Sequence, residues 1–334
     1  MRYRKLGTTD LTLSELGFGA WTVATNWWGK IEPDDGVKLL WKAADLGITF
    51  FDTADAYADG FGETIVAQAL NSRRHQLVYG TKVGYDIYTP QPRVGHAERP
   101  QRWDTAFIRH ACEQSLRRLR TDYIDVYQVH NPKMDAINND ELFGTLSALV
   151  KEGKIRYFAA AIGPDLGWLD EGLAVMEKRP IAAMQIIYNI LEQQPARKFF
   201  APARDKNVGL MSRVPHASDV LTSKFAVSPP VFSATDHRSH RRQQWLLQAM
   251  KKRTLVEFLE RDGHMTLAQA AIRFCLTEPN IASVLPNITS EADLTEYVGA
   301  SEVADISPDI ASRLWDVYDT GFGLVPEPSG AGAA

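Results

Sequence analysis

Short runs of apolar, mostly β-branched or aromatic residues recur along the chain, and longer segments with a different pattern separate them. Eight such runs cover residues 16–22, 49–55, 77–84, 124–130, 155–163, 182–189, 208–215 and 281–287. Strands that are buried on both faces have nearly continuous apolar runs of this kind. The pattern therefore predicts eight strands of a parallel sheet.

Most of the intervening segments place apolar residues three and four positions apart, as amphipathic helices do. Examples are residues 34–47, 107–120, 140–154, 169–180 and 243–263. Strands and helices in alternation predict a parallel sheet covered by helices, and its simplest closure is a (β/α)8 TIM barrel. Because no linker divides the chain, we expect one α/β domain over residues 1–325 and a disordered tail over residues 326–334.

The segment before the first predicted strand, residues 3–16, has the pattern of a β-hairpin with its turn at Thr8–Asp10. A hairpin in this place is suited to plug the N-terminal end of the barrel. We therefore expect a small antiparallel element ahead of the barrel itself.

Composition excludes several classes of protein. The hydrophobic fraction of 45% and the charged fraction of 23% are typical of a globular chain. No apolar run approaches the roughly 18 residues of a membrane span, and the N-terminus lacks a secretory signal, so we expect a cytoplasmic protein. A net charge of -4 gives no argument for binding to nucleic acid or to an anionic membrane. Cys112 and Cys275 fall in helix-like segments and are expected to be buried thiols, and the oligomeric state stays open.

Four polar residues stand at or just beyond the ends of consecutive predicted strands. Asp52 follows the second apolar run with Tyr57 shortly after it, Lys82 ends the third run, and His130 ends the fourth. Each alone has an ordinary structural explanation, such as a helix cap or a solvated amine. In barrels of this type the chemistry lies at the carboxyl ends of the strands, so the four together indicate an active site.

Several longer segments resemble the aldo-keto reductases. They read GITFFDTADAYADGFGE, LVYGTKVG, EQSLRRLRTDYIDVYQVHNP and VKEGKIRYF, and the resemblance extends over nearly the whole chain. Within that superfamily, RVPHASDVLTSKF followed by TDHRSHRR resembles a bacterial branch whose usual form is close to RVPLASGLLTGKF and then DHR. Carried over by position, the catalytic residues of the family are Asp52, Tyr57, Lys82 and His130.

These four residues have complementary chemistry. A phenol has a pKa of about 10 and gives up its proton reluctantly, so a tyrosine acting as a general acid benefits from a neighbouring cation. Lys82 would be that cation, and Asp52 would compensate its buried charge. His130 would hydrogen-bond the carbonyl oxygen of the substrate. The resemblance implies reduction of an aldehyde or ketone, with NADP or NAD as the hydride carrier.

The resemblance also implies a set of cofactor-binding residues. Gln185 matches the glutamine that holds the nicotinamide amide, and Arg213 matches a residue beside the ring. Ser290 and Glu296 match residues near the adenosine end. The complete set expected at the cofactor is Trp21, Thr22, Asp52, Gln185, Arg213, Ser290 and Glu296.

The cofactor motifs depart from the family pattern in several places. Ala161 and Ile162 replace a serine and an asparagine at the end of the fifth predicted strand, and Thr289 replaces the cation that clamps the 2'-phosphate. The other departures are His216 for leucine, Asp219, Ser223 and Asn287 for glycines, and Tyr297 for asparagine. A side chain in place of a glycine can obstruct a phosphate. We therefore expect a weakened clamp at Thr289, with NADPH preferred little over NADH.

Three functions remain open on this pattern. The first is a divergent reductase that tolerates NADH. The second is a non-redox enzyme, such as a lyase, epimerase or dehydratase of an oxidised sugar, that keeps the four catalytic residues without the cofactor. The third is a silent binding module. The intact tetrad argues against silence, whereas Ala161 and Thr289 argue against ordinary use of NADPH.

The substrate is expected to be a small carbonyl compound. Trp21, Trp27 and Trp28 follow the first predicted strand and would form an aromatic wall beside Tyr57 and His130. Two basic loops, which could hold an anionic group or simply be solvated, contain Arg93, His96, Arg99, Arg102, His237, Arg238, His240, Arg241 and Arg242. Asp236 with its neighbouring histidines lacks a ligand framework, so no metal site is expected.

Overall fold

The computed structural model describes residues 1–90, 98–163, 168–225, 232, 236–240, 243–261 and 264–324. The expected tail over residues 326–334 lies outside this range, as do Arg93, His96, Arg241 and Arg242, and the side chains of His237 and His240 are not described.

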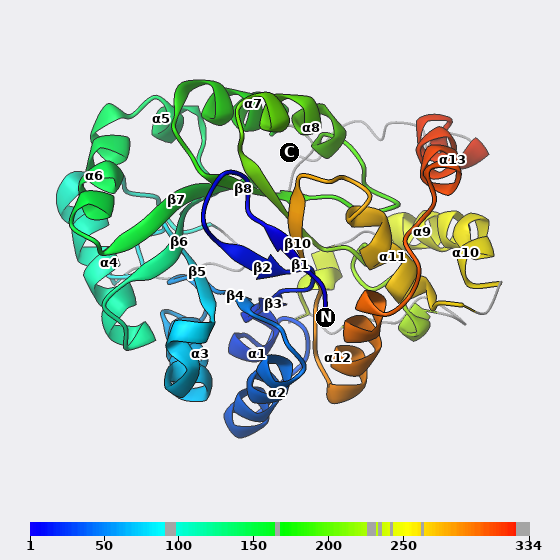
Figure 1. Cartoon of the computed structure of the whole chain (residues 1–334), viewed down its shortest axis with the longest axis horizontal. Coiled ribbons are helices and arrows are strands. Elements are labelled where there is room, and N and C mark those ends of the chain that lie inside the picture. Colours follow the sequence, from blue (N-terminus) through cyan, green and yellow to red (C-terminus); the bar gives the residue numbers. More distant parts are fainter. Residues whose placement is uncertain are drawn as a thin grey trace.

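Eight parallel strands follow one another around a single sheet in the order of the sequence (Figure 1). They are β3 (Phe18–Gly19), β4 (Phe50–Asp52), β5 (Val78–Val83), β6 (Ile124–His130), β7 (Ile155–Ala161), β8 (Ala183–Ile187), β9 (Gly209–Arg213) and β10 (Ile281–Leu285). The backbone N–H of Gly17 donates to the carbonyl of Val284 at 2.9 Å and that of Val284 donates to Glu15 at 2.8 Å, which closes the circle. Each predicted apolar run contains one strand, so the predicted TIM barrel is confirmed.

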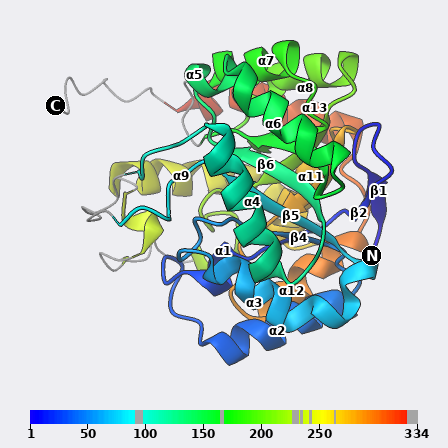
Figure 2. The ribbon, with the colours of Figure 1, turned by 90° about the vertical axis from the view of Figure 1, so that its left-hand side faces the viewer.

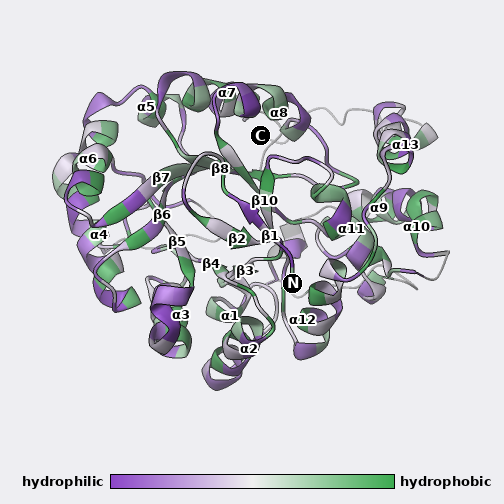
Figure 3. Cartoon of the chain, in the orientation of Figure 1, coloured by the Kyte–Doolittle hydropathy of each residue, from purple (hydrophilic) through white to green (hydrophobic). Residues whose placement is uncertain are grey.

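Helices surround the barrel and carry both hydrophilic and hydrophobic residues (Figure 3). The longer ones are α2 (Pro33–Asp45), α3 (Phe61–Leu70), α4 (Thr105–Leu119), α6 (Asp140–Lys151), α7 (Leu169–Lys178), α8 (Ala196–Asp205), α9 (Gln243–Val256), α11 (Leu267–Cys275), α12 (Glu291–Val298) and α13 (Pro308–Asp319). The short ones are α1 (Trp21–Ala24), α5 (Met134–Ile137) and α10 (Phe258–Arg261). Residues 243–263 were predicted as one helix, but the structure divides them into α9 and α10 with Glu257 in between.

Local sequence signals explain where several helices begin. Pro33 starts α2, where its missing N–H costs nothing. The Asp104 carboxylate accepts from the backbone N–H of Phe107 and caps α4. Thr266 and Gln269 form a reciprocal capping box at the start of α11.

The N-terminal hairpin consists of β1 (Tyr3–Lys5) and β2 (Thr12–Ser14) in antiparallel pairing. Leu6, Leu11 and Leu13 are at most 2% exposed and pack against inward-facing strand residues such as Phe50 and Met211. Figure 2 places the hairpin at one end of the barrel and α9 at the other. The predicted plug at the N-terminal end is therefore confirmed.

The cysteines and the lengths of the helices bear on two of the sequence predictions. Cys112 and Cys275 are free, buried thiols on α4 and α11, as predicted. Within the described ranges no helix has both the length and the apolar character that crossing a membrane requires.

Candidate active site

The strand pleat stacks a polar layer on an apolar layer inside the barrel. Because side chains alternate between the faces of a strand, residues two positions apart point to the same side. The inward apolar layer includes Phe50, Val126, Ala183 and Met211, and the residues two positions further along are Asp52, Gln128, Gln185 and Arg213. The polar layer thus lies at the carboxyl ends of the strands, as the sequence predicted for Asp52.

Lys82 joins two of the other predicted residues. Its ammonium donates to Oδ2 of Asp52 at 2.5 Å, to the carbonyl of Thr53 at 2.7 Å and to the hydroxyl of Tyr57 at 3.2 Å. The Lys82 side chain is 1% exposed. Burial disfavours its charge, but the charge of Asp52 and the contacts with Asp52 and Tyr57 together outweigh burial and raise the pKa of Lys82 above its ordinary value. Lys82 is therefore a cation in direct contact with a phenol.

Gln128 completes the environment of Asp52 and was missed at the sequence level. Its amide donates to Oδ1 of Asp52 at 2.6 Å, and the amide of Gln185 approaches its Oε1 at 3.4 Å. Both carboxylate oxygens of Asp52 are thus engaged. The missed signal was its spacing, because Gln128 stands two positions before His130 in IDVYQVH and must point to the same side.

His130 ends β6 and lies against two aromatic rings. Its ring centroid is 6.1 Å from that of Tyr57 and 5.0 Å from that of Tyr85, both edge-on. Burial and the positive charges of Lys82 and Arg213 hold the pKa of His130 well below its ordinary value. Nδ1 is buried and has no hydrogen-bond partner among the described residues. A neutral imidazole with an unused ring nitrogen therefore lies beside the phenol.

Trp21, one of the three tryptophans expected to form an aromatic wall, lies on a helix and against Tyr57. Trp21 and Thr22 belong to α1, because β3 already ends at Gly19 and the chain turns there. The ring of Trp21 is 5.4 Å from that of Tyr57 and 5.6 Å from that of Trp27. The hydroxyl of Thr22 donates to the carbonyl of Ile288 at 2.6 Å, so Thr22 ties α1 to the segment after β10.

Gln185 and Arg213 lie on neighbouring strands next to the end of β7. Ala161 pairs with Gln185 across the sheet. The guanidinium of Arg213 donates to the carbonyl of Ile162 at 2.9 Å, and its buried Nε has no partner among the described residues. These amide and guanidinium donors could hold the carboxamide of a nicotinamide.

Ser290 and Glu296 have structural contacts at the start and middle of α12. The hydroxyl of Ser290 accepts from the backbone N–H of Asp293 at 3.1 Å and caps the helix. The carbonyl of Glu296 accepts from the amide of Gln269 on α11 at 3.0 Å. Thr22 and Ser290 are both linked to the segment after β10, whereas the tetrad lies at the ends of β4, β5 and β6.

A cation does lie beside Thr289, although the sequence position itself carries none. Lys224, on the short helix η2 (Ser223–Phe225), donates to Oδ2 of Asp293 at 2.8 Å and contacts the hydroxyl of Thr289 at 3.1 Å. Sequence reasoning identified neither Lys224 nor Asp293, because they are 69 positions apart and only folding joins them. Lys224 thus places a cation beside Thr289, but this cation is already paired with Asp293.

Asp219 stands where the branch pattern has a glycine. The backbone conformation at this position explains why a glycine is usual there. Its φ is +70°, a conformation that costs a non-glycine residue on the order of 1 kcal/mol. Arg238, on η3 (His237–His240), donates to Oδ2 of Asp219 at 2.6 Å and to Oδ2 of Asp236 at 2.7 Å. The guanidinium also lies over the rings of Trp28 and Phe232 at 4.8 Å and 4.5 Å. Arg238 thus connects the loop after β3 to the loop after β9.

His216 and Tyr297 fill the space behind these ion pairs. Their ring centroids are 4.4 Å apart, and both residues are buried. Nε2 of His216 contacts the carbonyl of Ala268 at 3.1 Å, and burial lowers the pKa of His216 to about 4. The imidazole is therefore neutral and donates from Nε2.

Other polar groups in the described residues have local explanations. Arg99 pairs with Asp59 at 2.7 Å, and Arg102 pairs with Asp104 at 2.9 Å. Within the ranges that the structure describes, no three histidine, cysteine or acidic residues gather as a metal site would require.

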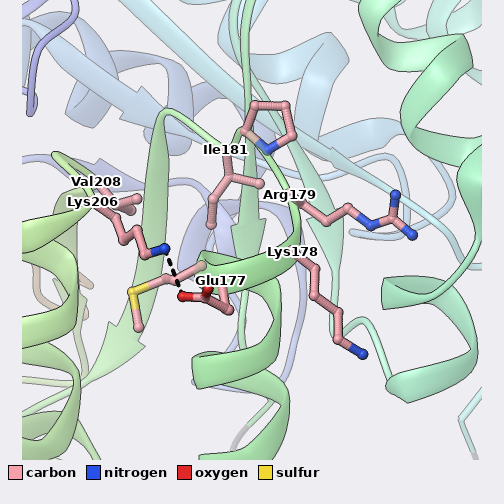
Figure 4. A pocket seen from close by; sticks show the side chains of 8 residues that line it. Glu177, Lys178, Arg179, Ile181, Lys206 and Val208 are labelled. Carbon is pink, nitrogen blue, oxygen red and sulfur yellow. Dashed lines mark ion pairs between the residues drawn. The ribbon is translucent and has the colours of Figure 1, made fainter.

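An open surface depression lies where α7 ends and β9 begins (Figure 4). Its charged side chains already have partners: Lys206 pairs with Glu177 at 2.6 Å, and Lys178 donates to Asn138 at 2.7 Å. The depression contains no predicted site residue and lies at the amino ends of the strands.

The fold and the site together define a class: a TIM barrel enzyme with a buried lysine–aspartate pair bound to a tyrosine at the carboxyl ends of its strands. The chain belongs to the aldo-keto reductase family, whose model, described as "Aldo/keto reductase family", matches residues 15–319. This family consists of oxidoreductases that act on small carbonyl compounds and in general use NAD(P)H.

Individual proteins resemble the chain over most of its length. The uncharacterized oxidoreductase YqkF of Bacillus subtilis is 29% identical over 94% of this chain and 95% of its own. The aldo-keto reductase YhdN of the same organism is 30% identical over 72% of this chain and 69% of its own. The solved structure of aldo-keto reductase AKR11C1 from Bacillus halodurans in its holo form has a TM-score of 0.77 at 26% identity, covering 95% of this chain and 96% of its own.

Proposed function

We propose that this chain reduces an aldehyde or ketone with hydride from NAD(P)H, and that Tyr57 supplies the proton. The observation that carries the proposal is the position of the Lys82 ammonium, which contacts Asp52 at 2.5 Å and the Tyr57 hydroxyl at 3.2 Å. A cation at that distance can stabilise the phenolate that remains once the proton has left.

Each of the surrounding residues has a defined task in this proposal. Asp52 holds Lys82 in its charged form, and Gln128 fixes Asp52 by occupying its second oxygen. His130 is neutral and donates an N–H to the carbonyl oxygen, which orients that oxygen toward Tyr57. Tyr57 would give its proton to the carbonyl oxygen, and Lys82 would stabilise the resulting phenolate.

The residues present fit a nicotinamide dinucleotide. When bound, the dinucleotide supplies the hydride. Gln185 and Arg213, with its unused Nε, would hold the carboxamide end. Lys224 and Arg238 are the cations available to the phosphates, and each is already paired with a buried carboxylate. Trp21 and Thr22 would lie beside the ring, and Ser290 and Glu296 near the adenosine.

The substrate that fits best is a small polar carbonyl compound such as a sugar. Trp21 adjoins Tyr57 and Trp27 adjoins Trp21, and both rings offer flat apolar surface, which suits the face of a sugar ring. Trp28 is 9% exposed and packs under Arg238, so its role in this proposal is structural.

The test is a turnover assay with purified protein, reduced dinucleotide and a panel of sugars, aldehydes and ketones, followed by loss of the reduced nicotinamide absorbance. We expect turnover that disappears in Tyr57→Phe. If the protein binds neither NADH nor NADPH and still transforms an oxidised sugar in a Tyr57-dependent manner, the non-redox enzyme replaces the reductase.

A further inference from the structure

Asp293 is held in one position by contacts on three sides. It is the third residue of α12, and its backbone N–H donates to the capping hydroxyl of Ser290. Its Oδ2 accepts from the backbone N–H of Thr289 at 3.0 Å, from the Thr289 hydroxyl at 2.6 Å and from Lys224 at 2.8 Å. The residue is 6% exposed. The carboxylate therefore cannot turn away from Thr289 without breaking these bonds.

The carboxylate is an anion at neutral pH. Burial works against its charge, but the bonds from Lys224 and Thr289 outweigh burial and lower the pKa of Asp293 below its ordinary value. Lys224 balances this charge and is thereby committed to Asp293. The cluster of Thr289, Lys224 and Asp293 consequently has no net positive charge to offer an additional anion.

Arg238, the cation on the neighbouring loop, is engaged in the same way. It pairs with both Asp219 and Asp236. Oδ1 of Asp219 is buried and has no partner among the described residues. Lys224 and Arg238 therefore both have carboxylate partners already, and a phosphate would have to compete with these carboxylates for either cation.

A carboxylate distinguishes between two kinds of adenosine ribose. It accepts hydrogen bonds and donates none, so it suits a ribose hydroxyl and repels an ionised phosphate, which also only accepts. Thr289 stands where the family pattern has the cation that clamps the 2'-phosphate, and its hydroxyl donates to Asp293. We propose that this chain selects NADH and NAD+ over NADPH and NADP+, and that Asp293 is the residue that makes the selection. This inference rests on the proposed function.

The experiment is a fluorescence titration of the full chain with NADH and with NADPH, using the wild type, Asp293→Asn and Asp309→Asn. Asp309 is the matched control, since it is an acid in the first turn of another helix, α13, and is exposed. We expect the wild type and the control to bind NADH at least tenfold more tightly than NADPH. In Asp293→Asn the preference should shrink at least tenfold, mainly because NADPH binds more tightly once Lys224 is released.

A competition experiment on the wild type covers the case in which Asp293→Asn does not fold. The 5'-monophosphate of adenosine should displace NADH at least tenfold more effectively than adenosine 2',5'-bisphosphate. If neither dinucleotide binds the wild type, the proposed function fails and this inference fails with it. If both bind and NADPH binds as tightly as NADH, or if Asp293→Asn changes both affinities equally, only the selection by Asp293 is overturned.

Discussion

The ends of β4, β5 and β6 and the loops after β9 and β10 both gather buried ions, but they are built differently. In the first region Asp52, Lys82 and His130 stand at or next to the last residue of a strand, and the pleat alone turns them inward. In the second region the ions stand on loops, on short helices and in the first turn of α12, and Asp219 has a left-handed backbone conformation. A site on strand ends inherits the regular spacing of the sheet, whereas a site on loops depends on contacts between distant segments.

The two regions also differ in how completely their charges are satisfied. Both oxygens of Asp52 have a donor, since Lys82 occupies one and Gln128 the other. In the loops, one oxygen of Asp219 has no partner among the residues that the structure describes, and burial raises the pKa of Asp219 above its ordinary value. Fully paired ions fix one geometry. We infer that the ends of β4, β5 and β6 are held in one geometry. Substitutions in the loops after β9 and β10 should change the affinity for the dinucleotide more than they change kcat.

The largest expected effect tests the catalytic region. Tyr57→Phe removes one hydroxyl at the mouth and the acceptor of one Lys82 hydrogen bond, so turnover should fall by about two powers of ten or more. The midpoint of thermal unfolding should stay close to that of the wild type, because the ring and its contact with Trp21 remain. Steady-state rates and thermal unfolding of the two proteins provide the check, and activity within a few-fold of the wild type would remove Tyr57 from its role.

The same contrast explains what could be predicted from the sequence. All eight strands were predictable, since apolar runs mark buried strands, and the same runs placed Asp52, Lys82 and His130 at or next to strand ends. The catalytic roles of the tetrad stay a prediction. Gln128 was also within reach through its spacing from His130. The run at residues 16–22 misled at its end, because a pattern of apolar residues does not indicate that β3 stops at Gly19 and that Trp21 begins a helix.

The loop contacts were beyond local reasoning. Ser290 followed by Asp293 has the spacing of a helix cap, and a cap is what the local pattern predicts. That Lys224 lies against Asp293, or that Arg238 reaches Asp219, follows only from the arrangement of segments around the barrel mouth. Ion pairs between distant loops leave no periodic signal in the sequence.

The second prediction concerns stability in the loop region. The pKa of His216 is about 4 in the folded chain and about 6.5 when unfolded, so the unfolded state binds more protons below pH 6.5. The contribution of His216 to the free energy of unfolding is fully present above pH 6.5 and falls as the pH drops toward the pKa of the folded state. His216 should account for a loss of about 2 kcal/mol in the free energy of unfolding between pH 8 and about pH 5. The variant His216→Leu should lack this part of the loss.

Denaturant unfolding of wild type and His216→Leu at both of these pH values measures this part of the loss. His75→Leu is the control for losing a histidine, because His75 is exposed at the end of η1 (Asn71–Gln76), and it should keep the acid sensitivity of the wild type. An equal loss of stability in wild type and His216→Leu would mean that the buried imidazole beside Tyr297 does not resist protonation.

The third prediction returns to the catalytic end. Gln128→Leu leaves Oδ1 of Asp52 without its donor in a buried site, which costs about 1–3 kcal/mol of stability. Because Asp52 then holds Lys82 less firmly, kcat should fall about tenfold while KM changes little. Gln128→Glu should be more severe, since it sets a second carboxylate against Asp52. Unchanged kcat in Gln128→Leu would show that Lys82 alone is enough to position Asp52.

The last prediction has the smallest expected effect and tests how the loop region distributes its charges. An arginine at position 289 supplies the cation that the family pattern has there, and a free charge-assisted contact to a phosphate would improve binding about tenfold or more. In this chain the new guanidinium would meet Asp293, which already bonds to Thr289 and Lys224. Thr289→Arg alone should therefore raise the affinity for NADPH only a few-fold, whereas Thr289→Arg combined with Asp293→Asn should exceed the product of the two single effects. Titrations of the wild type, both single variants and the double variant give the coupling directly. Strictly multiplicative effects would mean that Asp293 does not restrain a cation at position 289, and the charges of the loop region would then act independently of one another.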